Sequence, residues 1–128
     1  MDFGLSEDQG ILRDTVREFA TREIAPVAGG LEKRSEFPRE ILSGLAEMGI
    51  LGMAIPEEFG GAGYGPLSSA LVLEELAAAC ASTAVTVSVH NTASAGPITR
   101  FGSGAQRRKY LPRMASGEII GGFALTEP

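Results

Sequence analysis

The stretch from Leu67 to Phe101 constrains the fold most, because it is almost free of charge. Its fully charged residues are Glu74, Glu75 and Arg100 alone. If the part from residue 83 to 101 is helical, it is roughly 30 Å long at ~1.5 Å rise per residue, which is enough to cross a small domain. A helix that is apolar on nearly all sides has to be buried on nearly all sides. We therefore expect the rest of the chain to pack around this stretch.

The composition is that of one soluble globular domain. The chain has 128 residues, of which 44% are hydrophobic, and a net charge of -5. An acidic balance disfavours nucleic-acid binding. The single cysteine, Cys80, forms no internal disulfide, which favours a reducing compartment. We find no signal-peptide pattern and no apolar run of membrane-spanning length, so we expect a cytoplasmic protein without a membrane span.

Capping patterns and apolar periodicity predict helices in the first half. Ser6-Glu7-Asp8-Gln9 is a capping-box pattern, and apolar residues follow it at helical spacing. We predict a helix over Ser6–Arg34 with a weak point at Ala25–Gly30, which contains a proline and two glycines. A second helix is predicted from Pro38, at its first position, to a glycine cap at Gly49.

The glycine-rich run over residues 56–65 predicts a series of turns. Glycine-rich loops also bind phosphates at helix starts. This loop lacks the lysine of a P-loop and the preceding strand of a dinucleotide fold, so a structural role is favoured.

Periodicity leaves the centre of the chain open. Leu67–Ala81 is predicted to be helical, but Val85–Val89 alternates at period two with β-branched residues, which is typical of a strand. Helix and strand both remain possible for Thr83–Phe101. Adjacent Glu74 and Glu75 point about 100° apart on a helix, so they do not form a paired acid/base site.

Isolated reactive side chains in this stretch are interpreted as structural. Cys80 has no cationic neighbour in the sequence and is predicted to be a small core residue. His90 has no second ligand at metal-binding spacing, so a hydrogen-bonded core histidine is favoured over a metal ligand or general base. The sequence predicts no metal site.

The end of the chain changes character. Ser103-Gly104-Ala105-Gln106 is a second capping box that opens a short helix, with Pro112 at a kink. Ile119–Leu125 then has the pattern of a strand. No other strand is available to pair with it, so its partners are expected in sequence beyond Pro128.

These last residues resemble a known family. Phe123-Ala124-Leu125-Thr126-Glu127-Pro128 is similar to the start of the flavin-binding signature of acyl-CoA dehydrogenases. Ile55–Gly63, Cys80–Thr83 and Gly96–Ser103 also match that family's pattern in order and spacing. The resemblance covers essentially the whole chain and is greatest to the short-chain, butyryl-CoA-type members.

The resemblance implies an all-α fold: a helical N-terminal domain over residues 1–117, followed by the first strand of a middle β domain, truncated, over residues 118–128. It also implies that Thr83–Phe101 is helical. The implied reaction is the FAD-dependent oxidation of the α,β-bond of an acyl-CoA thioester to the trans-2-enoyl-CoA, a step of fatty acid β-oxidation. The electrons pass to an electron-transfer flavoprotein, and the full-length protein is expected to be a homotetramer. The catalytic base of the family is a glutamate outside this chain.

The resemblance also assigns two sets of binding residues. The positions that bind the pyrimidine edge of the flavin are Phe123, Leu125 and Thr126. The positions that line the acyl-chain pocket are Val85, Thr86, Val89, His90 and Ala93. Plain core packing is an equally good interpretation of the second set, and no catalytic residue is assigned in this chain.

Three hypotheses remain for the chain as it stands. It is the N-terminal part of a flavoenzyme and inactive alone, a free-standing helical interaction module, or a catalytically inactive family member that acts as a scaffold. The sequence after Pro128 discriminates between them, because a flavoenzyme requires a β domain and a late glutamate.

Overall fold

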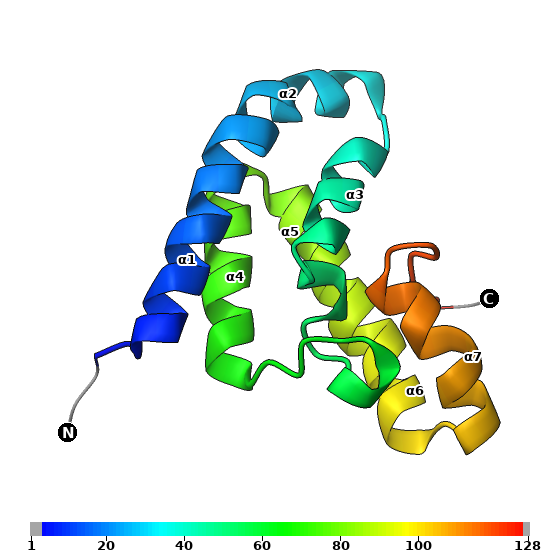
Figure 1. The fold of residues 1–128 in the computed structure, drawn as a ribbon. Helices are drawn as coiled ribbons and strands as arrows, with labels where there is room; N and C mark the ends of the chain where they lie inside the picture. Colours follow the sequence, from blue (N-terminus) through cyan, green and yellow to red (C-terminus); the bar gives the residue numbers. More distant parts are fainter. Residues whose placement is uncertain (1–3, 127–128) are drawn as a thin grey trace.

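The computed structural model describes residues 4–126, which fold into a helical domain (Figure 1). A long helix made of α1, η1 and α2 lies beside α4 and turns back at its top into α3. A second continuous helix made of α5, η4 and α6 runs behind α3 and ends beside α7. The elements are α1 (Glu7–Phe19), the π-helical turn η1 (Ala20–Ile24), α2 (Ala25–Arg34), α3 (Arg39–Glu47), the 3-10 turns η2 (Ile50–Gly52) and η3 (Glu57–Phe59), α4 (Pro66–Ala79), α5 (Ala81–Ser88), the π-helical segment η4 (Val89–Ala95), α6 (Gly96–Phe101) and α7 (Gly104–Ala115).

The predicted first helix is confirmed, but its irregularity lies earlier than expected. The Ser6 hydroxyl accepts from the Gln9 amide at 3.2 Å, and the Ser6 amide donates to the Gln9 side chain at 3.0 Å, so the capping box starts α1 as predicted. The chain widens into the π-helical turn η1 just before Pro26, which lies in the first turn of α2. Proline has no N–H to donate to the preceding turn, and its ring crowds the carbonyl four residues back. The strain therefore falls on η1, while the two glycines after Pro26 stay helical.

The second predicted helix is confirmed as α3, with Pro38 as its N-cap rather than its first helical residue. Gly49 follows α3 at φ 77°, a left-handed conformation that glycine adopts without a Cβ clash. Ile41, Leu42 and Leu45 are buried on the inner face of α3.

The glycine-rich loop folds back onto the chain before it. The Ala62 amide donates to the Gly52 carbonyl at 2.9 Å, and the Gly63 amide donates to the Ile55 carbonyl at 3.0 Å. A Cβ on Gly61 would lie 2.0 Å from the Ile55 carbonyl oxygen, so only glycine fits there. Because these amides bond to backbone carbonyls, the loop has the structural role predicted for it.

The open question over the centre of the chain is settled in favour of helix. Residues 81–101 form α5, η4 and α6 without a break. The alternating pattern of Val85–Val89 is overridden because no described segment is placed to pair with it as a strand, and a helix satisfies its own backbone groups. The most buried residues of this helix, with at most 1% of their surface exposed, are Thr83, Val87, His90, Asn91 and Ala95.

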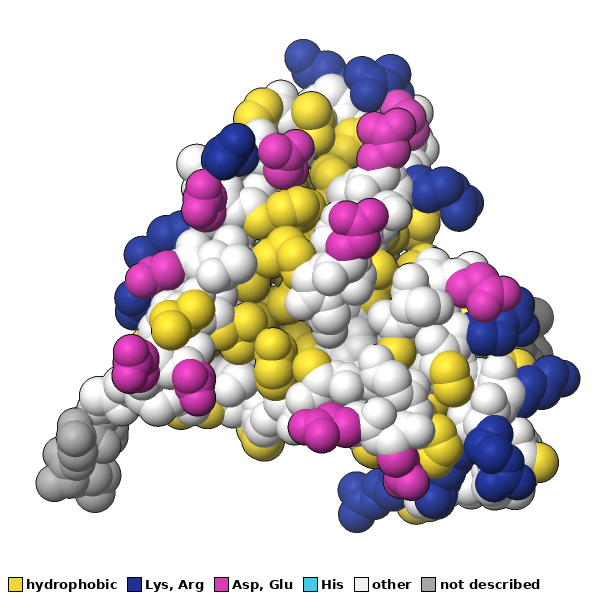
Figure 2. All heavy atoms as spheres, viewed as in Figure 1, with side chains coloured by type: hydrophobic (Ala, Val, Ile, Leu, Met, Phe, Trp, Pro, Cys, Tyr) yellow, Lys and Arg dark blue, Asp and Glu magenta, His cyan; other side chains and the backbone are white. Residues whose placement is uncertain are grey.

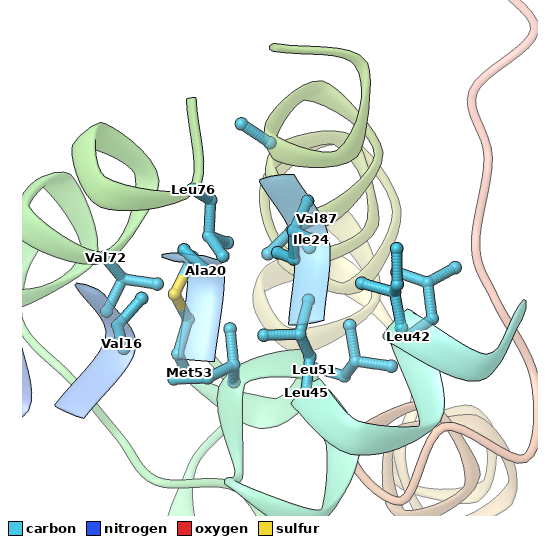
Figure 3. Packing of buried hydrophobic residues seen from close by; sticks show 13 residues of the cluster. Val16, Ala20, Ile24, Leu42, Leu45, Leu51, Met53, Val72, Leu76 and Val87 are labelled. Atoms are coloured by element: carbon cyan, nitrogen blue, oxygen red, sulfur yellow. The ribbon is translucent and has the colours of Figure 1, made fainter. Parts of the chain in front are cut away.

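The main hydrophobic core lies between the two long helices and α3 (Figure 3). Side chains of the first helix point toward those of α4, and α3 and the turn after it close the core from below. A smaller cluster joins Ile55 to α7. The main cluster includes Val16, Ala20, Ile24, Leu45, Met53, Val72 and Leu76, all with at most 2% of their surface exposed.

Charged side chains are distributed unevenly over the surface. Acidic and basic side chains are mixed over α1, α2 and α3, whereas Lys and Arg predominate around α6 and α7 (Figure 2). The same view shows hydrophobic side chains uncovered in the hollow between the first helix and α3.

The end of the chain differs from the prediction. The second capping box is confirmed at Ser103 and Gln106, and α7 continues through Pro112 as one helix rather than two short turns. Ile119–Leu125 adopts no strand, and residues 4–126 contain none. A strand needs a neighbour to pair with, and the described residues offer none, so the segment after α7 runs as an irregular chain over the surface of η4 and α7.

Candidate cofactor and substrate site

The residues assigned to the acyl pocket lie on α5 and η4, on a side of the helix that stays partly uncovered. Val85 is 60% exposed, and Thr86, Val89 and Ala93 are half-buried. The Thr86 hydroxyl donates to the Ser82 carbonyl at 2.9 Å, so it is occupied by its own helix. These four side chains therefore form an apolar stripe that is free for contact with further protein or a ligand.

His90 does not share this exposure. It is fully buried, and both of its ring nitrogens are bonded. The Gly121 amide donates to Nδ1 at 2.9 Å, so Nδ1 has no proton, and Nε2 carries the proton and donates to the Met114 carbonyl at 3.2 Å. Burial lowers the pKa of His90, and the carbonyls of Met114 and Leu51 oppose the shift in part, so the ring is neutral. The structure thus makes His90 the hydrogen-bonded core histidine that was the favoured interpretation.

One helical turn later, Ser94 holds the same segment. Its hydroxyl donates to the Gly122 carbonyl at 2.6 Å. A Cβ on Gly121 would lie 2.5 Å from the Ser94 Cβ and 2.7 Å from the Met114 methyl carbon, so the segment approaches η4 as closely as a glycine allows. Two consecutive residues of the segment, Gly121 and Gly122, are therefore fixed to one face of η4.

The residues assigned to the flavin come directly after this anchor. Phe123 is 57% exposed, Leu125 is 78% exposed, and Thr126 is also exposed. Within residues 4–126 the backbone of 123–126 makes no hydrogen bond. Its N–H and C=O groups are therefore free to bond with groups outside the described part of the chain. The last two residues of the signature, Glu127 and Pro128, lie outside the described part of the chain.

Both sets of candidates are thus carried by one helix. η4 bears Val89 and Ala93 on its uncovered side, and His90 and Ser94 bind the segment that leads into Phe123. His90 is separated from the other four pocket candidates by this arrangement.

Sequence reasoning missed Ser94 and Gly121, which build this anchor, although the Gly121-Gly122 pair was a signal of close backbone approach. It also gave no role to Asn91, which binds the helix to the turn after α3. Asn91 is fully buried. Its amide nitrogen donates to the carbonyls of Ile50 and Val87, both at 3.1 Å, and its oxygen accepts from the Ala54 amide at 3.2 Å.

The other candidates remain structural. Glu75 accepts two hydrogen bonds from Arg17 of α1, at 2.6 and 2.9 Å, while its neighbour Glu74 is exposed. Cys80 is half-buried at the corner between α4 and α5, with its Sγ 3.3 Å from the Ser82 hydroxyl. Burial raises the pKa of the Cys80 thiol, but hydrogen bonds from Ser82 and Thr83 outweigh that effect and lower it.

Residues 4–126 hold neither a metal-binding cluster nor a membrane-spanning helix. No group of three or more His, Cys, Asp or Glu side chains in that range is placed to hold a metal ion. In the same part of the chain, no helix has the length and apolar character needed to cross a membrane.

Comparison with known proteins decides the family. Residues 6–118 match the model of the acyl-CoA dehydrogenase N-terminal domain. The chain belongs to the acyl-CoA dehydrogenase family. Among curated relatives, the mitochondrial short-chain specific acyl-CoA dehydrogenase of Rattus norvegicus is 42% identical to this chain over 124 residues. The match covers 97% of this chain and 30% of that protein.

Solved structures agree with this assignment. Butyryl-CoA dehydrogenase from Megasphaera elsdenii is 34% identical with a TM-score of 0.89, over 100% of this chain and 34% of that one. An acyl-CoA dehydrogenase complexed with FAD from Bacillus anthracis is 36% identical with a TM-score of 0.90, and the match covers 97% of this chain and 21% of that one. A structure described as the electron transferring flavoprotein of Acidaminococcus fermentans contains a chain that is 39% identical with a TM-score of 0.93. That match covers 100% of this chain and 34% of that one.

This acyl-CoA dehydrogenase chain therefore spans between about a fifth and a third of the length of these relatives. Its helical fold and the predicted resemblance are both confirmed. The activity belongs to the longer proteins, of which this chain corresponds to the N-terminal domain.

Proposed function

We propose that the full-length protein is an FAD-dependent acyl-CoA dehydrogenase that oxidises a short-chain acyl-CoA thioester to the trans-2-enoyl-CoA. Residues 1–117 are its helical N-terminal domain, and residues 118–128 begin its middle β domain. The observation that carries this proposal is the segment Phe123–Thr126, which is anchored at one end and has exposed side chains and an unpaired backbone. Such a segment provides one edge for a flavin and cannot complete the site alone.

The residues of this chain would bind and orient. Phe123, Leu125 and Thr126 would hold the pyrimidine edge of FAD by backbone groups and a hydroxyl. Val85, Thr86, Val89 and Ala93 would form one wall of the acyl pocket and exclude water from it. His90 is left out of this wall because it is fully buried and both ring nitrogens are bonded.

The chemistry itself needs groups from elsewhere in the full-length protein. FAD, when bound, accepts hydride from the β-carbon of the substrate. A carboxylate outside this chain would remove the α-proton, and none of Glu74, Glu75 or Glu127 is assigned to that role. Charge that develops on the thioester oxygen would be stabilised by hydrogen bonds. The site therefore requires the middle and C-terminal domains.

The proposal includes the partners and the setting of the protein. The electrons would pass to an electron-transfer flavoprotein, the full-length protein would be a homotetramer, and the reaction would serve fatty acid β-oxidation. The single cysteine and the acidic composition support a cytoplasmic location.

The test uses the full-length protein and this chain side by side. Purified full-length protein should carry the yellow flavin absorption, and anaerobic butyryl-CoA should bleach it. The 128-residue chain, matched in concentration, should lose added FAD on a desalting column. A full-length protein that is colourless and stays so with FAD would favour a helical interaction module, and one that is yellow but unbleached by any acyl-CoA would favour an inactive scaffold.

A further inference from the structure

The buried His90 bonds at both ring nitrogens to segments on either side of a turn. It lies on η4, binds the end of α7 through Met114, and binds the chain after the turn through Gly121. The proposed function gives His90 no part. Its two hydrogen bonds nevertheless control the segment on which that function depends.

The bond to Gly121 requires a particular state of the ring. Nδ1 accepts the Gly121 amide at 2.9 Å only while it has no proton. The Nε2–H to Met114 bond, at 3.2 Å, selects that tautomer, because the nitrogen that donates leaves the other one free to accept. His90 thus couples the end of α7 to the position of the Gly121 amide.

Gly121 lies two residues before Phe123, so its placement determines the register of residues 123–126. A slip of one residue at Gly121 would put Ala124 in the place of Phe123 and Thr126 in the place of Leu125. The same slip would offer a flavin edge a donor in place of an acceptor. Ser94 fixes Gly122 by a separate hydrogen bond at 2.6 Å, so two adjacent residues, Gly121 and Gly122, are each held to η4.

We infer that His90 is a positioning residue for the cofactor: by accepting the Gly121 amide at Nδ1, it fixes the register in which Phe123–Thr126 meet the flavin. This inference rests on the proposed function. His90 touches neither substrate nor flavin, and it acts through Gly121.

Two substitutions separate the two hydrogen bonds of His90. In His90→Asn, the side-chain oxygen takes the place of Nδ1, so the acceptor for Gly121 is kept and the donor to Met114 is lost. In His90→Gln, the amide nitrogen takes the place of Nε2, so the donor is kept and the acceptor is lost. Both variants remove one hydrogen bond from the same buried position, so a purely structural role for His90 predicts similar effects from both.

The measurements are the FAD dissociation constant and the visible flavin spectrum of the full-length protein, with thermal unfolding recorded alongside. His90→Gln should weaken FAD binding about tenfold, the factor that corresponds to ~1.4 kcal/mol, and should shift the flavin bands. His90→Asn should restore the dissociation constant to within about twofold of the wild type at similar loss of stability. Val72→Ala, in the main core between α1 and α4, is the control for destabilisation alone and should leave the flavin bands in place.

Equal FAD affinity and unshifted bands in both His90 variants would overturn the inference and leave the proposed function intact. If His90→Gln does not fold, Ser94→Ala, which removes the second anchor from a half-buried side chain, takes its place with the same expected losses.

Amide hydrogen exchange at Gly121 provides a readout independent of FAD, and protection should survive in His90→Asn and be lost in His90→Gln. A wild-type protein that binds no FAD but shows this exchange pattern would refute the proposed function while confirming the anchor.

Discussion

The Asn91 side chain donates to the carbonyl of Ile50 at 3.1 Å, and this bond ties the buried helix to the turn that follows α3. The same amide group accepts from Ala54 and donates to Val87, so its hydrogen-bonding groups are used within the core. Removing this side chain takes one of two hydrogen bonds from the buried Ile50 carbonyl, which keeps the Met53 amide at 3.3 Å, and leaves the partly buried Ala54 amide without its partner.

We therefore predict that Asn91→Ala lowers the free energy of unfolding by about 2–4 kcal/mol, since it removes three hydrogen bonds that contribute ~0.5–1.5 kcal/mol each. Chemical denaturation followed by circular dichroism measures the change. The adjacent Thr92→Ala is the control. Thr92 is exposed and its hydroxyl bonds only within its own helix, so its loss should cost no more than ~0.5 kcal/mol. Similar losses for the two variants would contradict a special role for Asn91.

The buried His90 predicts a dependence of stability on pH. Burial lowers its folded pKa below the unfolded value of 6.5, and no charged side chain contributes to the shift. The charged side chains on the nearby end of α7 and the following turn, Arg113 and Glu118, pair with each other at 2.8 Å. Below pH 6.5 the unfolded chain binds a proton that the folded chain does not, so stability is full above that value and falls as the pH drops, by at most ~1.4 kcal/mol per pH unit.

Denaturant titrations at a series of values between about pH 7.5 and 5 check this prediction, with about half a unit between them. The wild type should lose stability over that window, and His90→Asn should lose less because it has no group that titrates there. Parallel curves for the two proteins would mean that His90 is not the source of the loss.

The ion pair of Arg17 with Glu75 predicts an effect at lower pH. The hydrogen bond from Arg17 lowers the pKa of Glu75 below 4.5, although burial opposes the shift. Its contribution is therefore present above pH 4.5 and is lost as the pH falls through the folded pKa. Glu75→Gln should lower Tm at pH ~7 by a few degrees, and a double-mutant cycle with Arg17→Met should show that the two losses are not additive.

The matched control for that pair is Glu18 with Arg22, which are joined at 3.0 Å with both side chains more than two-thirds exposed. Solvent screens such a pair, so Glu18→Gln should change Tm less than Glu75→Gln does. A larger effect at Glu18 would show that burial of Glu75 is unimportant.

The proposed acyl wall predicts a change in substrate preference. Val89→Phe adds bulk to the uncovered side of η4 and should raise KM for butyryl-CoA about tenfold in the full-length enzyme, because pockets discriminate by about 10–200-fold per methylene group. The flavin spectrum should stay unchanged. Val27→Phe, at an exposed position on α2, should leave KM unaltered. If KM is also unaltered in Val89→Phe, Val89 does not line the acyl pocket and is an ordinary surface residue.

The parts of the fold that could be predicted are those set by local chemistry. Both capping boxes and the glycine after α3 depend on residues within one helical turn, and all three lie where they were predicted. The position of the irregular turn before Pro26 was missed by a few residues, because proline strains the turn that precedes it rather than its own.

The parts that could not be predicted depend on partners distant in the chain. The alternation of Val85–Val89 pointed to a strand, and the absence of a strand partner among residues 4–126 decides against it. His90 bonds to a residue 31 positions away, and no periodicity reports that distance. The strand expected over Ile119–Leu125 needs a neighbour that residues 4–126 do not contain, so its pattern alone was insufficient.

The π-helical segment η4 has a consequence for insertions and deletions. Its wider turns hold about one residue more than an α-helix needs for the same rotation. Deleting a single residue between Val89 and Ala95 would therefore yield an unbroken α-helix of normal pitch that keeps Arg100 and Phe101 near their present face. The same deletion in the regular helix α4 would rotate every residue after it by about 100° around the helix axis.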